Sequence, residues 1–513
     1  MTRLRRISVL VTASVVCLAL HQAVGEEVVL TIPGYDYINA YGLDQPELSA
    51  VLTDGGSVIT EGGSPVIIEV FVDTGASGTA ISYLNAEGYD YEPFPGFGFV
   101  HVPSLGLDGV PAGEFTGTFL ETGIGGTELG NVTRDFGVKI LNGPMGGSGD
   151  PADFVDYGQH SLWVRMAPGV GEIVEVLGMT LVDPVNVVGM PVIHQRVMVM
   201  DPTPLVAQDR LATHLLPPGD GGIPQTNVTF DLHLVDMTGL APEEDPSHFD
   251  NPLVRHVTLT HDDGGGPASV SDSEFLFDTG SSATFISFAH AQAVGMIDAG
   301  YADLAAYLPD HIAADGITGE VGGIGGSVTV PLLELDEFRI AAKEGFDVVW
   351  QNVDVLVIDI TAPGSGGLLD GAIGMNLFVP AVTIDPADPL GGLEDISPGY
   401  FDAIVFDATD VNNAELRVYC ELVPKRGDAN LDDCVDGLDY IAWSNNYLTG
   451  TEWGQGDFVD DDMVDGLDYI VWSNNYEGSC PAAPSVPEPG SGLLAALAGL
   501  ALIRRRRARR LSH

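Results

Sequence analysis

Hydrophobic residues form one continuous run near each end of the chain and many short runs between them. The run at residues 7–20 follows three arginines, and the run at residues 490–503 is followed by six. Between the ends, apolar stretches such as residues 66–72 and 275–277 are separated by turns rich in glycine and proline, which is typical of short β-strands. After residues 437 and 466, apolar side chains recur at helical spacing. The pattern predicts an all-β body and a small α-helical unit behind it.

The first apolar run has the features of a secretory signal peptide, predicted over residues 1–25. Arg3, Arg5 and Arg6 form a basic start, the run is too short to span a bilayer, and small residues follow at 23–25. The signal predicts an exported protein, located in the cell envelope, on the cell surface or outside the cell. A propeptide between residue 26 and about residue 50 stays open.

The second apolar run lies between Val486-Pro487-Glu488-Pro489 and the arginine cluster. This arrangement, over residues 481–513, resembles the PEP-CTERM sorting tail of bacterial exported proteins. The resemblance implies transient membrane association and removal by a sorting protease. Fourteen apolar or small residues are marginal for spanning a bilayer, and an ordinary tail anchor is the alternative.

Composition and charge limit the number of domains and the classes of partner that this chain can have. The chain has 513 residues, 45% of them hydrophobic, which is enough for two to four folded domains. Its net charge of −53 argues against a nucleic-acid partner, because phosphate repels such a surface. Acidity of this kind suits solubility or calcium binding.

Three motifs occur twice in the same order. FVDTGAS at residues 71–77 recurs as LFDTGSS at 276–282, and each copy is followed by Ile-Ser. GIGG at 123–126 recurs at 323–326, and VVGM at 187–190 recurs as AIGM at 372–375. The offsets are 205, 200 and 185 residues. The repetition predicts a gene-duplicated pair of lobes, at residues 26–205 and 206–422.

The order Asp-Thr-Gly, glycine-rich hairpin and apolar-apolar-Gly resembles that of the aspartic proteases, both pepsin-like and retroviral. The Gly-Ile-Gly-Gly hairpins are more similar to retroviral flaps, and neither contains the tyrosine of a pepsin-like flap. The resemblance implies a two-lobed, all-β double barrel, an endopeptidase activity and a peptide or protein substrate.

By this resemblance, Asp73 and Asp278 are the catalytic pair. Two adjacent carboxylates share one proton, as in pepsin, so one can take a proton from water while the other polarises the scissile carbonyl. Which aspartate takes which role is left open. Supporting residues of the two loops are Thr74, Gly75, Thr279, Gly280, Gly189 and Gly374; the flaps are Gly123, Ile124, Gly125, Gly126, Gly323, Ile324, Gly325 and Gly326.

Other interpretations compete with this one. A single Asp-Thr-Gly also occurs as an ordinary exit from a strand into a turn. The lobes could instead bind peptide without turnover in a structural cell-surface protein, or process only this protein or one neighbour. The 12 histidines form no paired zinc spacing, and Cys420 is the first cysteine after the signal, so zinc and cysteine enzymes are disfavoured.

Two acidic segments, residues 427–447 and 456–476, share one pattern at an offset of 29 residues. Oxygen ligands fall at EF-hand-like positions, which predicts calcium binding. The first loop offers Asp428, Asn430, Asp432, the main chain of Cys434, Asp436 and Asp439; the second offers Asp457, Asp461, the main chain of Met463, Asp465 and Asp468, with Val459 at the third position. Residues 424–480 resemble a dockerin, which implies structural calcium and a possible cohesin-like or envelope partner. An acidic linker is the alternative.

Cysteine usage adds one expectation. Cys420 and Cys480 bracket the acidic segments, so a disulfide between them is plausible in an oxidising compartment, with Cys434 as the odd thiol. Other pairings stay open.

Overall fold

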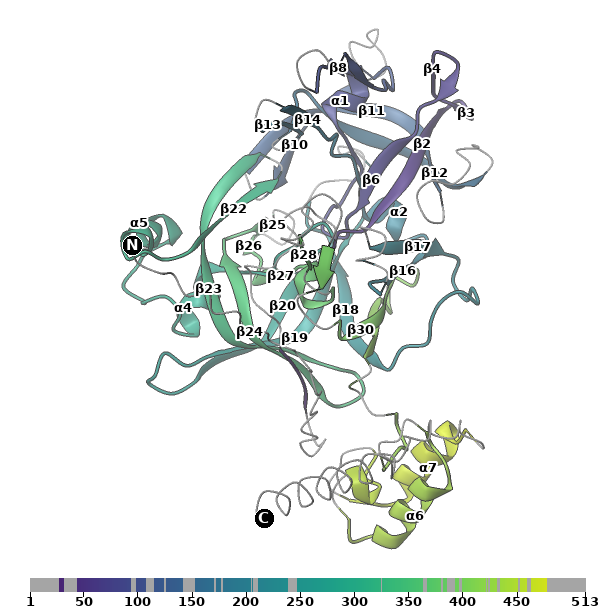
Figure 1. The fold of residues 1–513 in the computed structure, drawn as a ribbon, viewed down its shortest axis with the longest axis vertical. Helices are drawn as coiled ribbons and strands as arrows, with labels where there is room; N and C mark the ends of the chain where they lie inside the picture. Colours follow the sequence, from purple (N-terminus) through teal and green to yellow (C-terminus); the bar gives the residue numbers. More distant parts are fainter. Residues whose placement is uncertain are drawn as a thin grey trace, which may run out of the picture. The chain divides into compact units, whose positions relative to one another are not determined.

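The computed structural model describes residues 27–31, 44–93, 98–107, 115–123, 126–141, 153–169, 172–176, 179–203, 205, 211–238, 247–323, 325–362, 367–379, 382–384, 393–395, 399–420, 422, 425–430, 434–450, 453–458 and 463–477. The predicted signal peptide and sorting tail lie outside these ranges. One compact unit spans Glu26–Val423, and residues from Pro424 onward belong to another. The larger unit is mostly strand, as predicted, and Figure 1 shows its earlier strands in purple and blue beside later ones in teal and green.

The first sheet of the larger unit has eight strands. In spatial order they are β10 (Phe115–Gly123), β11 (Gly126–Leu141), β12 (Phe154–Arg165), β7 (Ala80–Ile81), β15 (Val187–Val188), β6 (Ile68–Val72), β2 (Glu47–Asp54) and β3 (Ser57–Val58).

The second sheet has thirteen strands. In spatial order they are β17 (Ala212–Leu216), β16 (Val197–Asp201), β30 (Phe401–Asp407), β31 (Glu415–Cys420), β18 (Val228–Val235), β19 (Asn251–His261), β20 (Ala268–Phe277), β27 (Gly371–Ile373), β21 (Phe285–Ile286), β24 (Asp347–Val357), β23 (Gly326–Ala341) and β22 (Thr318–Gly323), with β1 (Glu27–Thr31) beside β24.

The two sheets repeat one topology. The run β10-β11-β12-β7-β15-β6-β2 matches β22-β23-β24-β21-β27-β20-β19 strand for strand, and equivalent pairs are parallel or antiparallel alike. In both runs one further pairing, β2 with β11 and β19 with β23, joins the ends of a six-strand path. The repeated motifs therefore occupy equivalent places in a duplicated arrangement.

Two strands cross from the first half of the chain into the second sheet. β16 pairs with β17 and β30, and β1 runs parallel to β24, where Leu30 is fully buried. Both strands belong to the residues predicted as the first lobe. The halves are thus joined by shared strands as well as by their facing loops.

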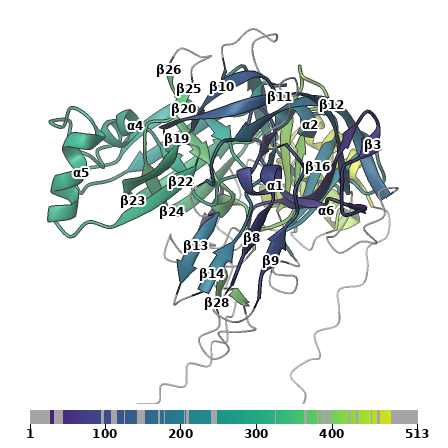
Figure 2. The ribbon, with the colours of Figure 1, turned by 90° about the horizontal axis from the view of Figure 1, so that it is seen from above.

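The remaining elements of this unit are short. The helices are α1 (Tyr83–Glu87), α2 (Met190–Ile193), α4 (Phe288–Ala293), α5 (Leu304–Ala313) and the 3₁₀ helix η3 (Met375–Leu377). The hairpins are β4 (Thr60–Glu61) with β5 (Ser64–Pro65), β8 (Tyr89–Tyr91) with β9 (Val100–Val102), β13 (Ile173–Val176) with β14 (Met179–Val182), β25 (Thr361–Ala362) with β26 (Gly367–Leu368) and β28 (Val382–Ile384) with β29 (Leu393–Asp395). The amide of Thr180 bonds to the carbonyl of Pro93 at 2.8 Å and so ties β14 beside β8 (Figure 2).

The serine of each repeated Ile-Ser pair has a structural purpose. Ser82 caps α1 and Ser287 caps α4, each with its hydroxyl accepting a backbone amide of the first turn. A serine N-cap satisfies a donor that the helix leaves open. The repeat thus includes the helix that follows each Asp-Thr-Gly loop.

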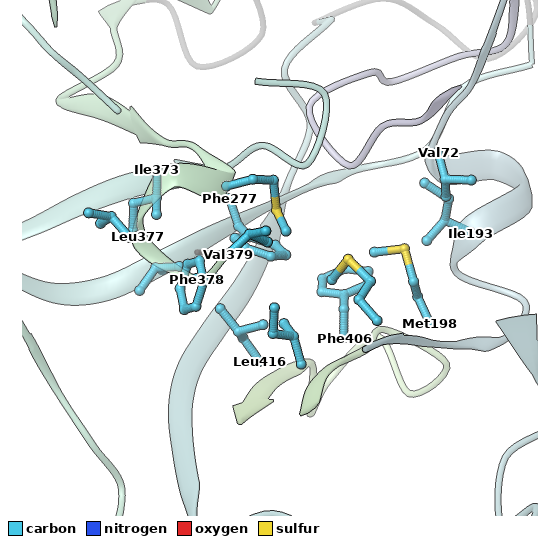
Figure 3. Packing of buried hydrophobic residues seen from close by; sticks show 14 of the residues in the cluster. Val72, Ile193, Met198, Phe277, Ile373, Leu377, Phe378, Val379, Phe406 and Leu416 are labelled. Atoms are coloured by element: carbon cyan, nitrogen blue, oxygen red, sulfur yellow. The ribbon is translucent and has the colours of Figure 1, made fainter. Parts of the chain in front are cut away.

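A continuous hydrophobic core supports both Asp-Thr-Gly loops. Val72 and Phe277, the residues before the two aspartates, are fully buried, and Figure 3 shows them with Met198 and Phe406. These side chains come from both halves of the chain. Because a close-packed core resists displacement, the two loops start from a common rigid base.

The smaller unit is helical, as predicted, with α6 (Gly437–Asn446), the 3₁₀ helix η4 (Trp453–Gln455) and α7 (Gly466–Asn475). Its helices pack through aromatic rings; the centroids of Tyr440 and Trp472 lie 5.1 Å apart, and those of Trp443 and Tyr469 lie 5.2 Å apart. Within the described ranges, the helices are all too short or too polar to cross a membrane.

Candidate active site

The two Asp-Thr-Gly loops lie face to face. Asp73 follows the last residue of β6 and Asp278 the last residue of β20, and a side-chain hydrogen bond joins the two carboxyl groups. A methyl carbon placed on Gly75 would lie 2.6 Å from Oδ1 of Asp278, and one on Gly280 would lie 2.4 Å from Cγ of Asp73. Each glycine is therefore required because the opposite carboxylate occupies the space that a side chain would need.

Thr74 and Thr279 join the loops by four hydrogen bonds. The amide of Thr74 donates to Oγ1 of Thr279 at 3.0 Å, and the amide of Thr279 donates to Oγ1 of Thr74 at 3.1 Å. Each hydroxyl then donates to a carbonyl of the other half, Thr74 to Phe277 at 2.5 Å and Thr279 to Val72 at 2.6 Å. Both threonines are fully buried, so these bonds are shielded from water.

The backbone donors around the two carboxylates are unequal. Oδ1 of Asp73 accepts the amides of Gly75 at 2.7 Å and Ala76 at 3.2 Å, whereas Oδ1 of Asp278 accepts the amide of Gly280 at 3.0 Å. Amide donors stabilise the charged form of a carboxyl group. The geometry therefore favours an ionised Asp73.

The surroundings of the pair hold a proton on Asp278. Burial raises the pKa of both carboxyl groups, and the charge of Asp73 together with its hydrogen bond raises the pKa of Asp278 well above its ordinary value. For Asp73, the hydrogen bond from Asp278 and the backbone amides lower the pKa and so oppose the effect of burial. Two adjacent carboxylates cannot both ionise easily, and the pair is suited to hold one proton on Asp278.

This proton makes the free energy of unfolding depend on pH. The ordinary pKa of the Asp278 carboxyl is 3.8, and the folded value is higher, so the unfolded chain releases a proton that the folded protein keeps. Stability is then lost as the pH rises from about 4 through the folded pKa. Asp278→Asn should lack this loss, and urea unfolding of both proteins at pH 4 and pH 7 measures it. If the free energy of unfolding of Asp278→Asn differed from that of the wild type by the same amount at both pH values, the pKa of Asp278 would not be raised in the folded protein.

Gly189 and Gly374 lie behind the two loops. A methyl carbon on Gly189 would lie 2.1 Å from the carbonyl oxygen of Gly78, and one on Gly374 would lie 2.2 Å from that of Ala283. The next residues bond to the loops at equivalent positions, the amide of Met190 to the carbonyl of Ala76 at 2.9 Å and that of Met375 to the carbonyl of Ser281 at 2.8 Å. Any side chain at these glycines would push the loops forward.

The tips of the two glycine-rich hairpins meet. Gly123 pairs with Gly126 between β10 and β11, and Gly323 pairs with Gly326 between β22 and β23. A methyl carbon on Gly325 would lie 2.3 Å from the carbonyl carbon of Gly126, and both residues have positive φ angles, +87° and +120°. Glycine is thus needed there for conformation and for close approach. Ile124, Gly125 and Ile324 lie outside the described residues.

Three residues beside the loops had no signal in the sequence. The side-chain amide of Gln45 donates to the carbonyl of Gly280, Ser282 donates to Oδ1 of Asp44 at 2.7 Å, and the side-chain amide of Asn251 donates to the carbonyl of Thr74 at 3.0 Å. Asp44, Gln45 and Asn251 stand at or just before strands far from either motif. Only the repeat, which places Gln45 and Asn251 at equivalent positions near the start of β2 and β19, could have drawn attention to them.

The acidic segments bury several carboxylates. Asp428, Asp439, Asp457 and Asp468, at the first and last ligand positions, are at most 1% exposed. Asp436 and Asp465 cap α6 and α7, while Asp432 and Asp461 lie outside the described residues. Among the described residues, which do not include Asp432 and Asp461, no group of three or more His, Cys, Asp or Glu side chains is placed to hold a metal. Backbone amides already bond to both oxygens of Asp439 and of Asp468, so burial of these two groups does not by itself require a cation, and calcium binding stays a prediction.

The other predicted calcium ligands that the structure describes are Cys434 and Asn430 in the first acidic segment and Met463 in the second. Cys434 is buried, Met463 is 48% exposed, and the amide of Asn430 donates to Oδ1 of Asp439 at 3.3 Å. The side-chain acceptor of Asp439 therefore already organises the first loop, and Asp468 does the same for Phe458 in the second at 2.6 Å.

The predicted disulfide of Cys420 is wrong. Cys434, taken as the odd thiol, is disulfide-bonded, whereas Cys420 is a thiol. Cys420 is the last residue of β31 and is fully buried in the core of the larger unit. Its backbone amide donates to Oδ1 of Asn227 at 2.8 Å, which fixes the end of the strand where the sulfur is buried.

The assignment of this site depends on the residues and their geometry. The loops, the threonine bonds and the hairpin tips come from two equivalent sets of strands that together enclose a pair of carboxyl groups. A comparison of the chain with protein-family models and with curated proteins found no match.

Proposed function

We propose that this protein is an exported aspartic endopeptidase, which hydrolyses peptide bonds with a water molecule activated between Asp73 and Asp278. The observation that carries the proposal is the hydrogen-bonded pair of carboxyl groups on equivalent loops, with a proton favoured on one of them. The closed six-strand path in each half supports a double barrel of the aspartic-protease kind.

The unequal surroundings suggest a role for each aspartate. Asp73, which accepts two backbone amides of its own loop, would take a proton from the attacking water. Asp278, which keeps its proton, would donate a hydrogen bond to the scissile carbonyl and stabilise the charge that develops there. After attack, Asp73 would pass the proton that it took from water to the leaving amine. The pair then again holds a single proton, on Asp278. The threonine bonds hold both groups in place, so little reorganisation is needed.

The hairpins support a peptide as substrate. Paired strands β10–β11 and β22–β23 meet at their tips, where the amide of Gly325 also donates to Oε2 of Glu128 at 3.5 Å. An extended chain beneath the hairpins would find main-chain partners on both sides. Hairpins that close over a peptide would also exclude water from the pair. No metal or organic cofactor is part of this mechanism.

The smaller unit and the chain ends complete the proposal. The unit at residues 424–480 would bind structural calcium as a dockerin-like module and engage a cohesin-like or envelope partner. The signal peptide would direct export, and a sorting protease would remove the PEP-CTERM-like tail after transient membrane association. The mature protein would then act in the envelope, on the surface or outside the cell.

The test is peptide cleavage by residues 26–480, followed by mass spectrometry on a peptide library from pH 3 to pH 8. Cleavage should depend on one shared proton, fall at both ends of this range, and disappear in Asp73→Asn and in Asp278→Asn, which are expected to fold. Activity that survives in either variant would remove the two-aspartate mechanism. A folded protein that binds peptides but yields no product would instead be a peptide-binding surface protein, and an aspartate-dependent change only in its own mass would indicate self-processing.

A further inference from the structure

One short segment of the second half lies against the first catalytic loop. Residues 247–251, here called the brace, lead into β19 and contact the first half repeatedly. The amide of Phe249 donates to the carbonyl of Ser77 at 2.9 Å, and the ring of Phe249 stacks on His194 with centroids 3.7 Å apart. Ser247 and Ser161 exchange amide-to-hydroxyl bonds of 2.8 and 3.0 Å. The brace thus reaches the loop that carries Asp73.

Asn251 ends the brace and bonds to the loop with both ends of its side chain. Its Nδ2 donates to the carbonyl oxygen of Thr74 at 3.0 Å, and its Oδ1 accepts the hydroxyl of Ser77 at 2.5 Å. The side chain is fully buried, so water cannot replace either bond. It spans the loop from the residue after Asp73 to the residue after Ala76.

The bond to Thr74 acts on a particular peptide group. The carbonyl of Thr74 and the amide of Gly75 belong to one planar unit, which turns as a rigid body. The same amide donates to Oδ1 of Asp73 at 2.7 Å, the shortest backbone bond to either aspartate. A donor on the carbonyl oxygen both fixes the plane and polarises its amide. Asn251 is therefore joined to Asp73 through a single peptide group.

The second loop lacks this arrangement. Gln45, equivalent to Asn251, donates to the carbonyl of Gly280, which lies one peptide group further along. The amide that donates to Asp278 belongs to the plane of Thr279 and Gly280, and the described contacts of Gln45 do not include that plane. The two halves thus differ at the group that directs an amide to the carboxylate.

We propose that Asn251 is a positioning residue, which holds the Gly75 amide on Asp73 and so makes Asp73 the ionised member of the pair. This inference rests on the proposed function for its effect on turnover. Loss of the Asn251 donor would let the peptide plane turn away and would leave Asp73 less able to carry the negative charge. The water-activating group would then ionise only at higher pH.

The test compares Asn251→Leu and Asn251→Asp with the wild type. Leucine removes both bonds without adding a charge. Aspartate keeps an acceptor for Ser77 but loses the donor to Thr74; it replaces leucine only in the comparison of kcat with KM, because its own charge would also move the pH profile. We expect kcat to fall about tenfold or more with KM within about twofold, and the acidic limb of the pH profile to move up by about half a unit or more. Unchanged kcat and an unchanged pH profile in a folded variant would overturn the inference.

Asn227→Leu is the matched control. Asn227 also bonds with both ends of its side chain to another strand, donating to the carbonyl of Cys420 and accepting its amide, each at 2.8 Å. The same chemical change there should lower stability without moving the pH profile. A profile that moves equally in Asn227→Leu would reduce Asn251 to a structural role and overturn the inference.

A second measurement separates this inference from the proposed function. Carboxyl ¹³C NMR can follow the titration of Asp73, identified by the signal missing in Asp73→Asn. If the wild type cleaves no peptide, the proposed function fails, but the pKa of Asp73 should still rise in Asn251→Leu, which removes the donor without adding a charge. A pKa that stays at the wild-type value would overturn the positioning role whether or not peptides are cleaved.

Discussion

Gly280→Ala is expected to reduce kcat/KM for peptide cleavage by at least about 10²-fold, while the protein stays folded. The added methyl would lie 2.4 Å from Cγ and 2.5 Å from Oδ2 of Asp73, far inside contact distance. The carboxylate must therefore move away from Asp278, which breaks the bond between them. Gly75→Ala should have the same effect from the other side, because its methyl would lie 2.6 Å from Oδ1 of Asp278.

The matched control is Gly221→Ala, where no heavy atom lies within 4 Å of the added carbon. It should leave cleavage unchanged. Steady-state kinetics on one library-derived peptide, with thermal unfolding of each variant, measures the difference. If Gly280→Ala retained wild-type activity, the two carboxylates would not be packed as closely as the loops place them, and the shared-proton mechanism would lose its basis.

These glycines illustrate how far the sequence alone could lead. The repeated Asp-Thr-Gly predicts a turn after each aspartate, and glycine in a turn is usually explained by its own backbone freedom. Here the reason lies in the other half of the chain, at a residue more than 200 positions away. Repetition could predict that the two loops are equivalent, but it could not show which atoms of one loop exclude a side chain from the other.

The sheet to which each strand belongs was harder to predict than the repeated motifs. The strands β1 and β16 are short and largely apolar, and nothing local in their sequences distinguishes a partner in the same half from one in the other. Leu30 and Met198 are fully buried because β24 and β30 lie beside them. Asn251 could not be predicted for a similar reason, since a single buried amide has no pattern. The pairing of Cys420 was wrong because spacing along the chain does not reveal that β31 points the thiol into a core.

Removal of calcium is expected to unfold the smaller unit and leave the larger one intact. Asp428, Asp439, Asp457 and Asp468 bring four carboxylates to at most 1% exposure within about 40 residues. Without a cation their mutual repulsion and lost hydration oppose folding. At calcium concentrations far above the dissociation constant, binding adds several kcal/mol to the stability of the unit, so a chelator should lower its melting temperature by about 10 °C or more.

The two loops should lose calcium together. The indole of Trp443 donates to the carbonyl of Asp465 at 2.7 Å, and that of Trp472 donates to the carbonyl of Asp436 at 2.8 Å, so each helix is bonded to the loop before the other. Asp468→Asn in the second loop should therefore weaken both sites, whereas Asp410→Asn, at an exposed position of the larger unit, should weaken neither. Tryptophan fluorescence and calorimetry of residues 26–480, with and without chelator, measure both effects. Equal melting in the two conditions would show that these carboxylates fold without a cation, and two independent losses of calcium would show that the crossed indole bonds do not couple the loops.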